Sequence, residues 1–310
     1  MVTGLSVQPI KQLTDLWSLS LTHMGQMIDN TIINWISRLT RLTQLTLDLQ
    51  NSCITPIPNS FNTLLSLNIK GSISLILAPL ATIRSATLED VTMEVPMGDN
   101  TWATSAEWIS LVDAVKAKWL TCLHGFSLED HQALQNTLSL PSVFGALFQA
   151  EKLEHFEIEQ LKSTSDLMNA LCHQIAVSWR MLHILHIKIP HQYMGHHYSP
   201  SIDALIDLVN YCSHLKSLGL YVDFQGMPTH PSQHSTSSHS LESLLFGWSA
   251  VGDKLAIVRH LDNLFPQLKC LGFIVPNSDA VKTWEQVKTF IWAFKDVCAD
   301  ERARVEKLYR

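Results

Sequence analysis

The sequence predicts an α/β solenoid, in which short parallel strands stack side by side and helical segments return along the other side of the sheet. The first observation is a pattern of four positions with spacings of three, three and two residues, apolar except at some first positions such as Ser238, which occurs ten times along the chain. The second is its period, because the last positions of the ten repeats span 252 residues in nine intervals, or 28 residues on average. The third is the helical spacing of apolar residues between the repeats.

Each repeat ends in an alternation of apolar and other residues, which is typical of a short strand with one buried face. The repeats end at Leu21, Leu47, Ile69, Leu88, Leu128, Ile158, Ile187, Leu220, Phe246 and Phe273. Two intervals depart from the period. Only 19 residues separate Ile69 from Leu88, so we expect an extended or 3₁₀ return there, and the 40 residues before Leu128 include an insertion at 91–104.

The segments between the strands carry helix signals. Apolar residues share one helix face in the ranges 28–39, 109–119, 168–179, 202–209 and 255–265. Thr104 with Glu107 predicts a capping box, and Ser199 followed by Pro200 predicts a second helix start. Short strands that alternate with helices at this period predict a right-handed α/β horseshoe, with a parallel concave sheet and a helical convex side.

The repeat pattern predicts that the chain divides into two parts. Residues 1–276 form the solenoid of about ten irregular repeats. Residues 277–310 begin with the helix-cap residues Asn277, Ser278 and Asp279, continue in a long amphipathic stripe and end in a charged tail. Because the last repeat of a solenoid would expose its core, we expect this segment to form a capping helix.

The repeats, from about Leu13 to Val275, resemble the leucine-rich-repeat family. Their length and helical returns are most similar to the irregular repeats of fungal F-box/leucine-rich-repeat proteins. That resemblance implies a substrate-recognition role in an F-box-type ubiquitin ligase. The family places Asn or Cys three residues after the last leucine, whereas this chain has other residues there, His131 among them. Only twelve residues precede the first repeat, too few for an F-box, so we expect no adaptor-binding function in this chain. A fragment, a diverged paralogue and a stand-alone binder are the alternatives.

Composition argues against several classes of protein. With 46% hydrophobic and 16% charged residues the chain is expected to fold rather than remain disordered. A net charge of −6 and a pI near 6.2 argue against a nucleic-acid partner, and no apolar run reaches the length of a membrane span. Six widely spaced cysteines without a C-x-x-C motif indicate reduced, buried thiols. We expect a soluble protein in the cytoplasm or nucleus, monomeric or part of a larger complex.

The exposed strand positions should line the concave face and form the binding surface. The expected binding residues are Glu89, Glu129, His155, Glu157, Glu159, His186, Lys188, Tyr221, Leu245 and Ile274. Carboxylates dominate the middle repeats, and apolar side chains dominate the later ones. The hypothesis is a protein partner that offers a basic segment and an apolar anchor.

No motif for catalysis or for a cofactor is present, so we expect a binding protein rather than an enzyme, with no cofactor. His191, His196 and His197 cluster in one segment, but no HExxH, C-x-x-C pair or EF-hand loop accompanies them, and a solvated loop without metal is the favoured interpretation. Two alternatives remain: a scaffolding solenoid without a ubiquitin link, and a metal-dependent hydrolase that uses the histidine-rich loop.

Overall fold

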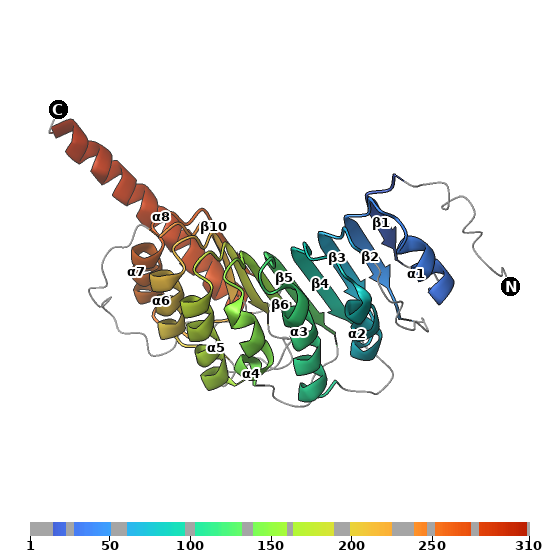
Figure 1. The fold of residues 1–310 in the computed structure, drawn as a ribbon. Helices are drawn as coiled ribbons and strands as arrows, with labels where there is room; N and C mark the ends of the chain where they lie inside the picture. The colour runs from blue at the N-terminus through green and yellow to red at the C-terminus, as the bar shows by residue number, and fades with distance from the viewer. Residues whose placement is uncertain are drawn as a thin grey trace. The chain divides into compact units, whose positions relative to one another are not determined.

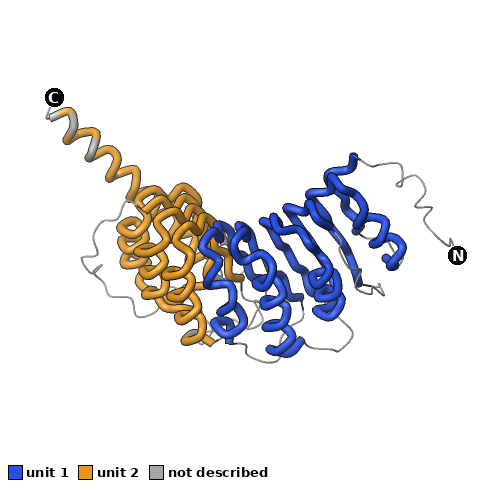
Figure 2. Tube along the Cα trace, viewed as in Figure 1, with its two compact units in different colours: residues 1–161 blue, residues 162–310 orange. Residues whose placement is uncertain are grey.

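The computed structural model describes residues 15–22, 28–50, 61–96, 103–131, 139–159, 164–188, 199–224, 239–246, 252–273 and 279–308. The chain forms two compact units, Met1–Leu161 and Lys162–Arg310, which are coloured separately in Figure 2. Both units are α/β, with parallel strands that alternate with helices (Figure 1). Within the described residues, no helix is both long enough and apolar enough to cross a membrane.

Among the residues that the structure describes, unit 1 holds strands β1 to β6, and each of β1 to β5 pairs in parallel with the strand that follows it in the chain. Its elements are β1 (Ser18–Leu21), α1 (Asn30–Ile36), β2 (Gln44–Asp48), β3 (Ser66–Lys70), α2 (Ile73–Thr82), β4 (Asp90–Val95), α3 (Ser105–Trp119), β5 (Gly125–Asp130), α4 (Leu140–Phe144), the 3₁₀ helix η2 (Gly145–Gln149) and β6 (His155–Glu159). Helices α2, α3 and α4 pack one against the next, so they form a layer beside the strands (Figure 1).

Unit 2 repeats this arrangement. Its elements are α5 (Ser165–Ser178), β7 (Ile184–Lys188), α6 (Ile202–Tyr211), β8 (Ser217–Leu220), β9 (Ser243–Phe246), α7 (Lys254–Leu264), β10 (Cys270–Phe273) and α8 (Asp279–Leu308). Strands β7 to β10 pair in parallel in chain order, as the strands of unit 1 do. The expected C-terminal helix is α8, and it buries Trp284, Val287 and Ile291. The division at residue 276 stays a prediction.

The core lies between the strands and the helices. Alternate residues of β2, β3, β6, β7 and β9 point into it, as with Leu45 and Leu47 of β2, which are 2% and 1% exposed. In unit 1, Phe126, Phe144 and Phe156 meet with ring centroids 5.4 to 6.1 Å apart. Such interlocking rings bury large apolar areas and fix how β5, α4 and β6 pack. The period-2 burial confirms the predicted strand pattern for these repeats.

Two lysines donate hydrogen bonds to backbone carbonyls at the carboxyl end of the helix that precedes their own. Lys118 of α3 donates from Nζ to the carbonyl oxygens of Leu80, Ala81 and Ile83 at 2.7 to 3.0 Å, where α2 ends. Lys295 of α8 contacts three carbonyls after α7 in the same way. Carbonyls at and just beyond a helix end lack the amides of a following helical turn, so each lysine supplies hydrogen-bond donors where the helix provides few. Partial burial lowers the pKa of Lys118.

The predicted capping box is confirmed. The Thr104 hydroxyl accepts from the Glu107 amide at 3.3 Å, and the Glu107 carboxylate accepts from the Thr104 amide at 2.7 Å. The second predicted helix start is wrong by two residues, because α6 takes Ser201 as its N-cap instead of Ser199. The expectation of buried cysteines holds for Cys172 and Cys212, whereas Cys270 is exposed.

The fourth repeat is displaced from its predicted position. Leu67 and Ile69 of β3 pair with Val91 and Met93 of β4, so this repeat ends at Met93 and the prediction of Leu88 is wrong. The interval after Ile69 is therefore 24 residues, and it holds the ten-residue α-helix α2 instead of an extended or 3₁₀ return. Likewise, residues 91–95 of the expected insertion belong to β4.

The error has a physical origin. The first apolar position of the fourth repeat is taken by Ser85, which is buried and donates its hydroxyl to the Leu64 carbonyl at 2.6 Å. The Ser85 carbonyl in turn accepts from the Trp119 indole at 2.7 Å. The Ser85 hydroxyl also accepts from the Thr87 amide at 3.3 Å. Because the Leu64 carbonyl and the Thr87 amide satisfy the hydroxyl, the serine can occupy an apolar position. With serine at the first position, and with Val91 and Met93 where most repeats have leucine, this repeat is not recognised from the spacing of apolar residues.

Candidate functional site

Strand pairing in unit 1 aligns the outward-facing side chains into rows. The row at the carboxyl end of the strands, here the charged row, consists of Asp48, Lys70, Glu94, Glu129 and Glu159. Neighbouring strands lie about 4.8 Å apart, so these side chains are direct neighbours. The charged row holds four carboxylates and one lysine. It is therefore strongly acidic over β4, β5 and β6.

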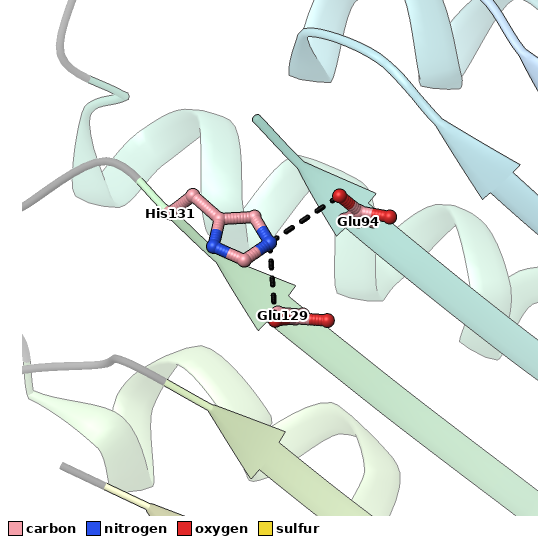
Figure 3. A group of neighbouring side chains, drawn as sticks. All are labelled: Glu94, Glu129 and His131. Carbon is pink, nitrogen blue, oxygen red and sulfur yellow. Dashed lines mark ion pairs between the residues drawn. The ribbon is translucent and has the colours of Figure 1, made fainter. Parts of the chain in front are cut away.

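Three side chains of this region converge on one point (Figure 3). The Nε2 of His131 lies 3.0 Å from Oε1 of Glu129 and 3.3 Å from Oε1 of Glu94. The three side chains keep between 26% and 34% of their surface exposed. One ligand atom from each lies within 4.8 Å of the other two, so they could hold a metal ion.

Strand geometry explains the convergence. Glu94 and Glu129 are register partners on β4 and β5. His131 follows Glu129 by two residues, and its backbone amide donates to the Val95 carbonyl at 2.8 Å, so the pairing continues past the end of β5. Residues two apart in an extended chain share a face. Three side chains are thus held from two adjacent strands without a long loop.

Lys70 joins this group from β3. Its Nζ contacts Oε1 of Glu94, the oxygen that also faces His131. The lysine therefore offsets part of the negative charge of the charged row at this point. Glu159 extends the row on the other side as the register partner of Glu129.

A second charged group lies at the amino ends of the same strands. Asp90, Gly125 and His155 align across β4, β5 and β6, and His124 lies 3.8 Å from the Glu154 carboxylate. Burial raises the pKa of Asp90, and the nearby carboxylates Glu89 and Glu154 raise it further. His155 and His124 act in the opposite direction on the pKa of Asp90. Several groups of both signs thus share this end of the face.

The expected acidic residues lie on this face with one exception. Glu129, Glu157 and Glu159 are half-buried outward positions of β5 and β6, and His155 is exposed at the start of β6. Glu89 lies just before β4, outside the charged row, because the fourth repeat is displaced. Glu94 takes the position in the row that was predicted for Glu89. For this reason the repeat pattern does not reveal Glu94, and it assigns no binding role to His131.

In unit 2 the expected binding residues have mixed outcomes. His186, Lys188 and Leu245 are half-buried outward positions of β7 and β9, and His186 Nε2 lies 3.0 Å from the Ser217 hydroxyl. The expectation for Tyr221 is wrong, because this side chain is 4% exposed and burial raises its pKa to about 12. Ile274 lies outside the described residues.

Tyr221 is buried because the chain leaves the strand pattern after β8. Leu220, Tyr221 and Val222 are buried in succession, which strict alternation along a strand does not allow. The Asp223 amide donates to the Pro200 carbonyl at 2.9 Å, so the chain here pairs with the segment before α6. The predicted apolar zone therefore loses its tyrosine and keeps Ile184 and Leu245 as half-buried outward residues.

The clustered histidines His191, His196 and His197 lie outside the described residues. A histidine farther along, His239, is a core residue. Its Nε2 donates to the Cys212 carbonyl at 2.9 Å, and its Nδ1 accepts from the Leu241 amide at 3.1 Å. Burial lowers the pKa of His239. Both ring nitrogens are used, so His239 supports packing and offers no ligand atom.

No protein-family model matches the chain, and no curated protein matches it. The resemblance to leucine-rich-repeat proteins therefore remains a prediction from the repeat pattern.

Proposed function

We propose that this chain is a leucine-rich-repeat solenoid of the right-handed horseshoe type, and that it recognises a protein partner through the outward face of its strands. The strand order supports the solenoid. Doubly wound sheets reverse their strand order at a switch point, whereas the strands of each unit follow one another in chain order. A repeat that pairs only with its neighbours in sequence is the hallmark of a solenoid.

The charged row is the observation that carries the binding proposal. Glu94, Glu129 and Glu159 are successive register partners, and Glu157 adds a fourth carboxylate to the same face of β6. A partner segment rich in lysine or arginine is attracted to such a face, and the attraction sets the orientation and rate of binding. The expected binding partner is therefore a protein with a basic segment.

The test uses a short labelled peptide of alternating lysine and serine, with binding followed by fluorescence anisotropy at low salt and in EDTA. The variant is the pair Glu157→Gln and Glu159→Gln. The control is the pair Asp113→Asn and Glu151→Gln, which removes the same charge from exposed residues outside the strands. We expect about fivefold weaker binding for the first pair, since each solvated ion pair contributes up to about 1 kcal/mol. An equal loss in the control pair would show that net charge alone attracts the peptide.

The role in an F-box-type ubiquitin ligase rests on the family resemblance alone. A longer gene product with an F-box, or co-purification of the ligase adaptor, would support it. The alternative is a scaffolding solenoid, which would bind its partner in the same way but without the adaptor. The hydrolase alternative depends on histidines outside the described residues. Catalysis is not part of the proposal.

A further inference from the structure

We propose that Glu94, Glu129 and His131 bind a divalent transition-metal ion of the Zn²⁺ class. This site goes beyond the proposed recognition of a protein partner. The sequence did not predict this site, because the repeat pattern placed Glu89 beside Glu129. In the structure β4 ends its repeat at Met93, and Glu94 is the residue beside Glu129.

The distances fit an ion at the centre of the three side chains. Ligand atoms about 2.0–2.2 Å from a tetrahedral ion lie about 3.3–3.6 Å from one another. The Nε2 of His131 is 3.3 Å from Oε1 of Glu94 and 3.0 Å from Oε1 of Glu129 (Figure 3). An ion can therefore take the place between these atoms after small side-chain rotations.

The donor set selects the class of metal. One imidazole nitrogen with two carboxylate oxygens suits Zn²⁺, Mn²⁺, Fe²⁺ or Co²⁺, whereas Mg²⁺ and Ca²⁺ prefer oxygen alone. Three protein ligands leave at least one position for water or a further ligand. The ligands are also well held, because Glu94 and Glu129 lie on paired strands and the His131 amide is bonded to Val95.

The charges near the site act in opposite directions. Glu159 lies beside Glu129 in the charged row and adds negative charge, which favours a cation. Lys70 contacts the same Glu94 oxygen that the ion would take, so its ammonium group must turn away when the ion binds. Lys70 therefore weakens the metal site. Its replacement by an uncharged residue of similar length should strengthen it.

The experiment measures Zn²⁺ binding to the full chain by calorimetry, and Co²⁺ binding by visible absorption. The sequence has fifteen histidines, so weak zinc binding elsewhere is expected and the comparison between variants is what decides. His131→Ala and Glu129→Gln should each remove one equivalent of tight zinc binding. The matched control is His155→Ala, which removes an exposed histidine from the next strand of the same face and should leave that equivalent in place.

Lys70→Met is expected to strengthen zinc binding, which an unfolded variant would not do. We expect it to bind Zn²⁺ about tenfold more tightly, because one positive charge is removed beside the ion. If His131→Ala binds zinc with the wild-type stoichiometry and affinity, or if Lys70→Met does not tighten binding, the proposed site is wrong. Circular dichroism of each variant checks the fold. The peptide assay in EDTA is independent of the metal, so failure of the metal site and failure of the recognition surface can be told apart.

Discussion

The Asp90 carboxylate lies over the backbone of Gly125, its register partner on the next strand. A Cβ atom added to Gly125 would be 2.2 Å from Oδ1 of Asp90, far inside van der Waals contact. Only glycine leaves this space, and the space allows Asp90 to be partly buried. Burial raises the pKa of Asp90, so the glycine on β5 controls the ionisation of a carboxyl on β4.

Gly125→Ala should therefore displace Asp90 and lower its pKa toward the ordinary value, because the carboxylate regains solvent. Since the displaced atom is the end of a side chain, we expect a loss of about 1 kcal/mol in the free energy of unfolding, at the low end for overpacking. Carbon NMR titration of the Asp90 carboxyl and urea unfolding measure the two effects.

Two variants make this prediction specific. Gly145→Ala is the control, because a Cβ there meets nothing within 4 Å, and it should be neutral or slightly stabilising. In an Asp90→Ala background the cost of Gly125→Ala should disappear, since the clash has been removed. A cost that persists in that background would mean that the alanine strains the backbone and not the Asp90 contact.

Much of the fold was predictable from the sequence, because a strand that buries one face needs alternating apolar residues. Nine of the ten predicted repeat ends lie in strands β1 to β3 and β5 to β10. The exception shows the limit of the pattern. Ser85 could replace an apolar residue because its hydroxyl accepts from the Thr87 amide and donates to the Leu64 carbonyl, which comes from another repeat. Such long-range hydrogen bonds leave no local signal.

The candidate site was predictable only in part. Glu129, Glu157 and Glu159 follow from strand alternation, so their outward position is confirmed. The partnership of Glu94 with Glu129 depends on register, and one displaced repeat was enough to put Glu89 in its place. The predicted exposure of Tyr221 is wrong for a different reason: β8 ends at Leu220, and the chain beyond it no longer follows the strand pattern. Strand ends are set by tertiary pairing, which the repeat does not encode.

A pH-dependent stability is expected from His239. Its neutral ring donates to Cys212 and accepts from Leu241, so protonation of Nδ1 would break the second bond. Burial lowers its pKa below the ordinary 6.5, so between these two values the unfolded chain binds a proton that the folded chain does not. The contribution of His239 is therefore complete above pH 6.5 and is lost as the pH falls below it, by at most about 1.4 kcal/mol per pH unit.

His239→Gln tests this, because glutamine retains a donor and an acceptor but does not titrate. Urea unfolding between pH 7.5 and 5.5 should show the wild type losing more stability than the variant on acidification. His214→Gln, at an exposed position of the same unit, should keep the wild-type profile. Parallel curves for the wild type and His239→Gln would contradict the assignment.

Zinc and the basic peptide should compete, because both use the negative charge of the charged row. The row holds four carboxylates and one lysine, and a bound dication would offset two of its negative charges. Saturating Zn²⁺ is therefore expected to weaken binding of the lysine-serine peptide to the wild type by about fivefold, and EDTA should restore it. In His131→Ala, which lacks the metal ligand but keeps every carboxylate, the peptide affinity should not respond to zinc. If zinc occupies the wild-type site and the peptide still binds as before, the peptide contacts a different surface and the charged row is not the recognition site.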